Sequence, residues 1–65
     1  MAAARKNYTV SYQYGLNLRE QPSKTSKVLA VLPFGQKVNI DPKAETPDGW
    51  FAVTTGGFVM AEFLK

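Results

Sequence analysis

The fold is decided by the stretch Leu16-Asn17-Leu18-Arg19-Glu20-Gln21-Pro22-Ser23, which changes from strand-like alternation to a turn within eight residues. On an extended backbone the two leucines point to one face, whereas Asn17 and Arg19 point to the other. Pro22 ends the strand, because proline cannot donate a hydrogen bond to a ladder and its φ is fixed. The sequence therefore predicts a strand over 16–19 and an exposed polar loop over 20–27.

A first strand is predicted over 7–13, where aromatic and β-branched residues alternate with polar ones. Tyr12 and Tyr14 share the face of Tyr8 and Val10, as core residues would. Tyr14 also precedes Gly15, which permits a bend, so its phenol could instead lie at an exposed edge and contact a ligand. Both interpretations stay open.

The run Val28-Leu29-Ala30-Val31-Leu32 is continuously apolar, which favours a buried strand. Gly35 can adopt the positive φ of a tight turn. The alternating strand over 36–40 is therefore expected to pair back onto Val28 to Leu32.

After a second polar loop, strands are predicted over 50–54 and 58–60, joined by a hairpin at Gly56-Gly57. Residues 61–64 are too few for a stable α-helix and predict a single 3₁₀ turn that plugs the core with Phe63 and Leu64. Short strands at this spacing indicate an all-β fold, either a small barrel or a two-sheet sandwich.

The composition limits the chemistry available to this chain. Its 65 residues are enough for one domain with a modest core, and 45% of them are hydrophobic. Cysteine and histidine are absent, so thiolate and imidazole groups cannot supply a disulfide, a metal ligand or a nucleophile–base pair. The net charge of +3 is a mild basic bias. We expect no catalytic residue, no cofactor and no metal site.

The first residues carry no structural signal of their own. We expect residues 1–6 to form a flexible tail and residues 7–65 to form the domain. Small residues precede basic ones in this segment, the reverse of a signal peptide. No stretch approaches the roughly 20 apolar residues of a membrane span. The compartment stays open, with an extracellular or wall-associated site expected if the domain is part of a larger exported protein.

Taken in order, the motifs from residue 16 to 64 resemble the bacterial SH3 domain family. That family typically shows Leu-Asn-Val-Arg, a Pro-Ser loop, Gly-Trp-x-x-Val and Gly-Trp-Val. The matching pieces here are Leu16-Asn17-Leu18-Arg19, Pro22-Ser23, Gly49-Trp50-Phe51-Ala52-Val53 and Gly57-Phe58-Val59. The chain departs from the pattern at Phe58, where the family has a second tryptophan, and in a last hairpin shorter by about two residues.

The resemblance implies an SH3-like barrel of five to seven strands that acts as a non-catalytic binding module. Its expected ligand is peptidoglycan or another cell-envelope polymer, to which it would target a larger protein. An alternative is a structural or protein-interaction module in an envelope or phage-related assembly. A third hypothesis, single-stranded nucleic acid, is disfavoured because the basic residues are scattered along the chain. The oligomeric state is open, with a monomer expected.

Exposed aromatic and polar side chains are the candidates for ligand binding. Trp50 is expected to be partly exposed, because Phe51 and Val53 point the other way, into the core. Arg19 could grip a ligand carboxylate or phosphate, or could hold its own loop through a backbone carbonyl or an acid such as Glu20 or Glu62. The complete candidate set is Tyr14, Asn17, Arg19, Trp50 and Phe58.

Overall fold

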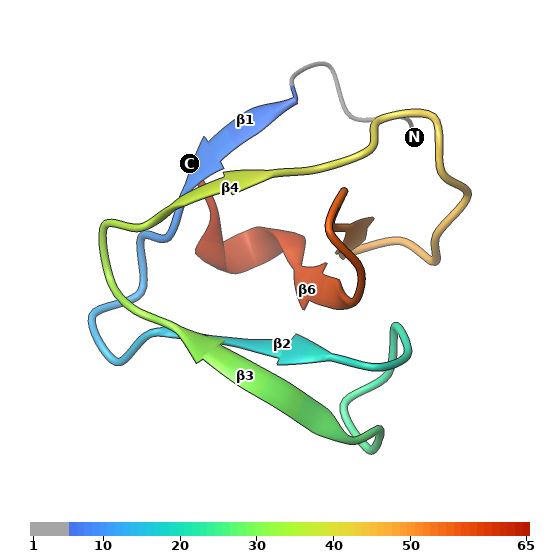
Figure 1. Cartoon of the computed structure of the whole chain (residues 1–65), viewed down its shortest axis with the longest axis horizontal. Helices are drawn as coiled ribbons and strands as arrows, with labels where there is room; N and C mark the ends of the chain where they lie inside the picture. Colours follow the sequence, from blue (N-terminus) through green and yellow to red (C-terminus); the bar gives the residue numbers. More distant parts are fainter. Residues whose placement is uncertain (1–5) are drawn as a thin grey trace.

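This computed structural model describes residues 6–65, which contain six short strands and one 3₁₀ helix (Figure 1). The predicted all-β fold with a terminal 3₁₀ turn is confirmed, and the strand number lies within the predicted five to seven. The elements are β1 (Asn7–Thr9), β2 (Leu16–Arg19), β3 (Val28–Leu32), β4 (Lys37–Asn39), β5 (Trp50–Ala52), β6 (Phe58–Met60) and the 3₁₀ helix η1 (Ala61–Phe63).

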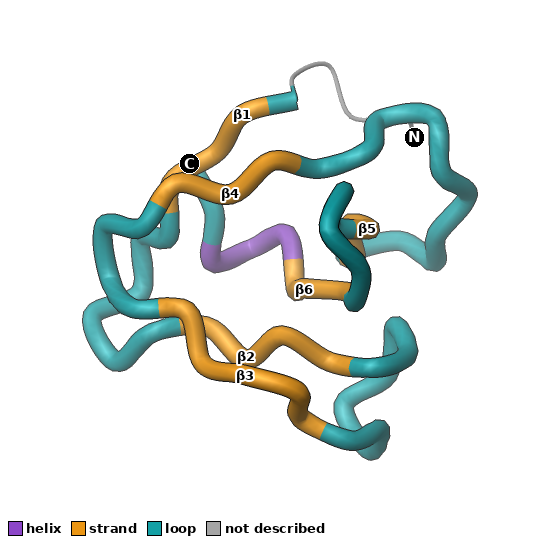
Figure 2. The backbone as a smooth tube through the Cα atoms, in the orientation of Figure 1, coloured by secondary structure: helices purple, strands orange, loops and turns teal. Residues whose placement is uncertain are grey.

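The strands form two antiparallel sheets that face each other across the core. One has four strands in the order β3-β2-β6-β5, and the other pairs β1 with β4. Figure 2 shows β1 and β4 on one side, β2 and β3 on the other, and the 3₁₀ helix between them. A single bridge from Ile40 to Val53 links the ends of β4 and β5, and another from Val10 to Leu64 links the end of β1 to the residue after η1. The result is a small SH3-like barrel.

The core is built from the inward faces of both sheets and from the C-terminal segment. Leu64 is buried and Phe63 packs against the core, as predicted. Phe51 and Val53 also pack inward, as predicted, and the Phe51 ring lies 5.1 Å from that of Tyr8. The buried cluster at its centre consists of Val10, Leu16, Val38, Ile40, Val59 and Leu64.

The prediction that β3 is a buried strand is wrong. β3 is the outermost strand of its sheet and pairs with β2 alone among the described strands. Its register also shifts at Leu18/Arg19, where Arg19 pairs with Val28 and Leu29 becomes an extra residue. Leu29 and Val31 are 47% and 60% exposed, because neither has a layer of chain above it.

The predicted pairing of the strand after Gly35 with β3 is also wrong. The turn itself forms, with Gly35 at φ +85° and Gln36 N donating to Pro33 O. Beyond it, however, Gly35 N donates to Val10 O, and Gln36 O accepts from Val10 N, both at 2.9 Å. These bonds place the chain after the turn next to β1, so β4 pairs with β1 in the other sheet.

The first strand is shorter than predicted, ending at Thr9 with a single bridge at Val10. The chain then turns, with Gly15 N donating to Tyr12 O at 2.9 Å and Gly15 at φ +89°. Tyr12 and Tyr14 therefore lie outside the strand and are 41% and 75% exposed, so the core interpretation of both is wrong. For Tyr14, the exposed-edge alternative agrees with the structure.

Two further findings concern the ends of the chain and the membrane. Of the predicted tail over residues 1–6, residues 1–5 lie outside the described part of the chain, and the Lys6 carbonyl accepts a 2.8 Å bond from Ile40 N. The described chain contains no helix long and apolar enough to cross a membrane.

Candidate ligand-binding face

The outer face of the four-stranded sheet brings four of the five predicted residues together. Arg19 pairs with Phe58, and residues directly opposite in an antiparallel pair share a face. Asn17 lies two residues before Arg19, and Met60 lies two residues after Phe58, so both share this face. Trp50 pairs with Met60 and therefore lies on it as well. The leucines of β2 point inward, as predicted. We call this surface the outer face.

A groove of about 260 Å³ opens at one end of the outer face, beside the turn between β1 and β2. It brings Tyr14, Asn17 and Arg19 together. Trp50 and Phe58 do not line it, although they lie on the same face of the sheet. The full lining consists of Tyr12, Tyr14, Gly15, Leu16, Asn17, Arg19, Met60 and Phe63.

Contacts between aromatic rings hold one wall of this groove in place. The ring of Tyr12 lies 4.7 Å from that of Phe63 and meets that of Tyr14 edge-on at 5.4 Å. Ser11 fixes the arrangement from behind, because both its backbone N and its Oγ donate to Phe63 O, at 2.8 and 3.0 Å. The Tyr14 side chain is thus exposed to solvent while its ring is held by contact with Tyr12.

Sequence reasoning did not include Tyr12, Met60 or Phe63 in the candidate site. Met60 could have been found, since it lies two residues after Phe58 in a strand and shares its face. Tyr12 lies two residues before Tyr14 and was assigned to the core, whereas Phe63 carried no such signal. Their rings meet because the Val10 to Leu64 bridge brings the two ends of the domain together.

Arg19 holds its own loop, which was one of the two roles considered for it. Its Nη1 donates to Ser26 O at 2.8 Å. Ser26 Oγ lies 2.9 Å from both Gln21 O and Ser23 O, so its single hydroxyl hydrogen can donate to either carbonyl and close the loop over 20–27. A guanidinium has five N–H donors in a planar fork, so this bond leaves donors for an acceptor in the groove.

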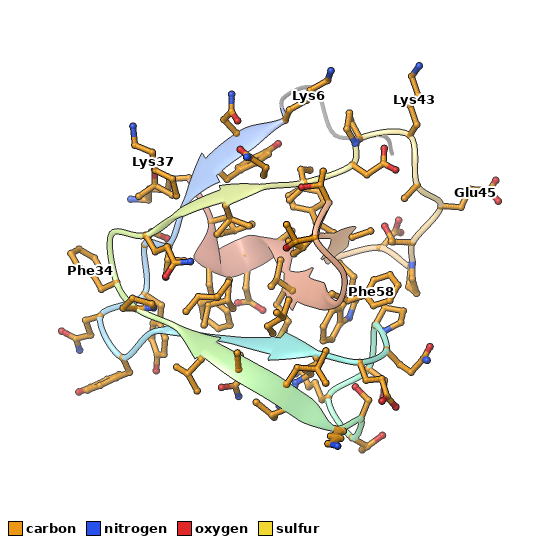
Figure 3. All side chains as sticks on the ribbon, viewed as in Figure 1. Lys6, Phe34, Lys37, Lys43, Glu45 and Phe58 are labelled. Carbon is orange, nitrogen blue, oxygen red and sulfur yellow. The ribbon has the colours of Figure 1, made fainter. Side chains whose placement is uncertain are left out.

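Trp50 and Phe58, both half-buried, lie on the β5 and β6 side of the outer face. The backbone of Trp50 is anchored to the preceding loop, because its N donates to Pro47 O at 3.1 Å and its O accepts from Thr46 Oγ1 at 2.7 Å. Figure 3 shows Phe58 and Phe34 on opposite sides of the molecule. The aromatic residues of the outer face are therefore separate from the exposed ring of Phe34.

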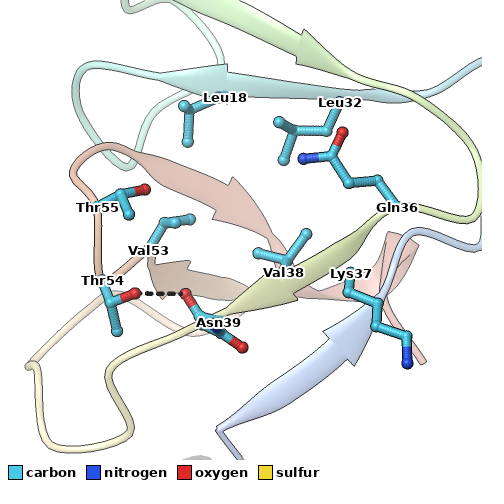
Figure 4. A pocket seen from close by; sticks show the side chains of 9 residues that line it. All are labelled: Leu18, Leu32, Gln36, Lys37, Val38, Asn39, Val53, Thr54 and Thr55. Atoms are coloured by element: carbon cyan, nitrogen blue, oxygen red, sulfur yellow. Dashed lines mark hydrogen bonds between the residues drawn. The ribbon is translucent and has the colours of Figure 1, made fainter.

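A second hollow of about 220 Å³ lies between the two sheets (Figure 4). The side chains of Leu18, Leu32 and Val38 point toward one another at its base, and all three pack in or against the core. At its rim, Thr54 Oγ1 donates to Asn39 O at 3.3 Å. None of the five predicted site residues lines it. This hollow is the open end of the barrel.

The three lysines labelled in Figure 3 lie away from the outer face. Lys6, Lys37 and Lys43 project on the side of β1, β4 and the loop after β4 (Figure 3). Aromatic and cationic groups are interleaved on surfaces that bind single-stranded nucleic acid. These three lysines do not contribute to such an arrangement with the rings of the outer face.

Comparison with known proteins assigns the chain to a family. No curated protein and no solved structure matches it. The sequence model of the bacterial SH3 domain matches residues 15–65, which run from the start of β2 through η1 and include every predicted site residue except Tyr14. This match covers most of the chain, and the barrel described above agrees with it. The chain belongs to the bacterial SH3 domain family, a family of binding modules.

Proposed function

We propose that this domain binds peptidoglycan or a related polymer of the bacterial cell envelope through the outer face, and thereby targets a larger protein to it. The observation that carries the proposal is the groove in which an exposed, supported tyrosine ring stands beside an amide and a guanidinium, those of Asn17 and Arg19. Family membership supports a binding role for the domain.

The groove offers the groups that such a polymer requires. A tyrosine ring provides a flat apolar face for a sugar or a peptide backbone at low entropic cost. The amide of Asn17 can donate and accept hydrogen bonds, which suits hydroxyl and acetamido groups. Arg19 can pair with a carboxylate of a peptide stem. Trp50 and Phe58 would extend contact along the sheet to further units of the polymer.

Co-sedimentation with purified insoluble peptidoglycan tests the proposal. We expect the wild-type domain to sediment with the polymer at low salt, and Tyr14→Ala to weaken binding about tenfold, which corresponds to about 1.4 kcal/mol. Phe34→Ala is the matched control, because it removes another exposed aromatic ring, 63% exposed against 75% for Tyr14, that does not line the groove. Absence of wild-type co-sedimentation at low salt, or equal losses in the two variants, would contradict the proposal.

Trp50→Ala and Phe58→Ala extend the same measurement to the β5 and β6 side of the outer face. Each is expected to weaken binding while leaving the barrel folded, because both side chains lie on the outer face rather than in the enclosed core. Far-ultraviolet circular dichroism checks the fold. Loss of folding in both variants would show that these rings act in the core instead.

A further inference from the structure

The free edge of β3 is the most exposed apolar feature of the sheet. β3 ends the strand order, and three of its side chains, Val28, Leu29 and Val31, are between 41% and 60% exposed. No charged residue occurs from Val28 to Gln36. Soluble proteins normally protect such edges with charges, prolines or short strands, because an unpaired edge is a template for another strand. The edge of β3 carries no such charge, and its one protective residue is Pro33, which directly follows the strand.

The geometry of the strand selects where a second strand can pair. Because of the register shift at Leu18/Arg19, regular pairing with β2 is confined to residues 30–32. The carbonyl of Leu32 faces β2, since a Cβ on Gly15 would lie 2.8 Å from its oxygen. Backbone groups alternate in direction along an antiparallel ladder. The N–H and C=O of Val31 therefore point away from β2, toward the free edge.

We propose that two copies of this domain pair antiparallel through β3, about a two-fold axis at Val31. Each Val31 N–H would donate to the C=O of Val31 in the other copy, and Ala30 would lie opposite Leu32. The interface would be isologous, as in most two-fold dimers. In this register Lys27 lies opposite Gly35 of the second copy, so no like charges face each other. Both paired segments are uncharged from Val28 to Gln36. This favours a second copy of the domain over a charged peptide.

The pairing would join two four-stranded sheets into one. The two-fold axis is perpendicular to the sheet, because residues directly opposite in an antiparallel pair share a face. Both outer faces would then lie side by side on the same surface. A consequence, which rests on the proposed function, is bivalent binding to a polymer of repeating units, so that the second contact becomes intramolecular. The strand interface alone is smaller than the about 1,200 Å² of stable complexes, so the free dimer is weak.

Sedimentation velocity over about 10 μM to about 1 mM, where weak complexes dissociate, tests the pairing. We expect the average mass to rise from 7.2 kDa toward twice that value. Over the same range, hydrogen exchange at the Val31 amide should slow about tenfold, because pairing places this N–H in a hydrogen bond that must open before exchange. Val31→Lys should remain monomeric, because it places a charge on the axis. Thr55→Lys is the matched control, since it adds the same charge in the β5–β6 turn and should still dimerise.

Three results would overturn the pairing: a constant mass, dimerisation of Val31→Lys as in the wild type, or open-ended aggregates in place of a dimer. Peptidoglycan binding is scored separately. A wild-type domain that dimerises without co-sedimenting would support the pairing and contradict the proposed function. A domain that co-sediments as a strict monomer would do the opposite.

Discussion

The strands β2 and β3 are hydrogen-bonded neighbours, but the more apolar of the two is the more exposed. β2 alternates apolar and polar residues, and its Leu16 is only 3% exposed. β3 is entirely apolar, yet its Leu29 is 47% exposed. β2 lies inside the sheet between β3 and β6, whereas β3 lies at its edge. Position in the sheet, more than apolar content, decides which of these leucines is enclosed.

Truncating one leucine in each strand gives the largest expected contrast. Leu16→Ala should cost about 3 kcal/mol of unfolding free energy, because it leaves a cavity in the enclosed core. A domain of this length has only about 3 to 10 kcal/mol in total, so this loss is a large fraction of its stability. Leu29→Ala should cost less than about 1 kcal/mol. Urea unfolding followed by circular dichroism measures both, and equal losses would contradict the difference between centre and edge.

The same contrast explains which parts of the fold the sequence could predict. The bounds of β2 and β6 were predicted correctly, because alternation and turn residues are local signals. The exposure of β3 and the partner of β4 were not, because a local pattern does not say which strand ends a sheet. The bonds from Gly35 and Gln36 to Val10, which direct β4 to β1, join segments far apart in the sequence.

For the candidate site, alternation was again the informative signal. Asn17 and Arg19 could be assigned to the outer face because the leucines between and beside them define the inner one. The groove could not be predicted, because its aromatic wall joins Tyr12 in an early turn to Phe63 at the end of the chain. Such a contact depends on closure of the whole barrel.

Gly15, at the start of β2, gives the next largest effect. Its φ is +89°, and a Cβ there would lie 2.8 Å from Leu32 O and 3.1 Å from Val31 Cγ1. Gly35, in the turn that follows β3, has a similar φ of +85° with nothing within 4 Å. Both alanine variants should lose about 1 kcal/mol through the left-handed backbone. Gly15→Ala should lose a further 1 kcal/mol or so, because the added methyl forces β2 and β3 apart.

Unfolding in urea again measures the pair. Because the backbone cost is shared, the difference between the two variants reports the contact between β2 and β3. Equal stabilities for Gly15→Ala and Gly35→Ala would show that the edge strand moves freely away from β2.

Arg19 tests the link between β2 and the loop that leads to β3. Arg19→Met keeps the apolar stem and removes the bond to Ser26 O, so it should cost about 1 kcal/mol. Amide exchange at Glu20, whose N donates to Lys27 O, should become faster in the variant. Lys37→Met, at an exposed position in β4, is the control and should leave both quantities unchanged. Unchanged exchange at Glu20 in Arg19→Met would contradict a loop-holding role.

The smallest expected effect is at the centre of the edge strand. Val31→Lys should change the free energy of unfolding by less than about 0.5 kcal/mol, because the side chain is 60% exposed and a lysine can extend into water. Leu18→Lys, one strand inward and packed against the core, should unfold the domain because it places a charge there. Urea unfolding at low protein concentration compares the two. A loss above about 1 kcal/mol for Val31→Lys would mean that β3 supports the monomer itself, rather than presenting a free edge.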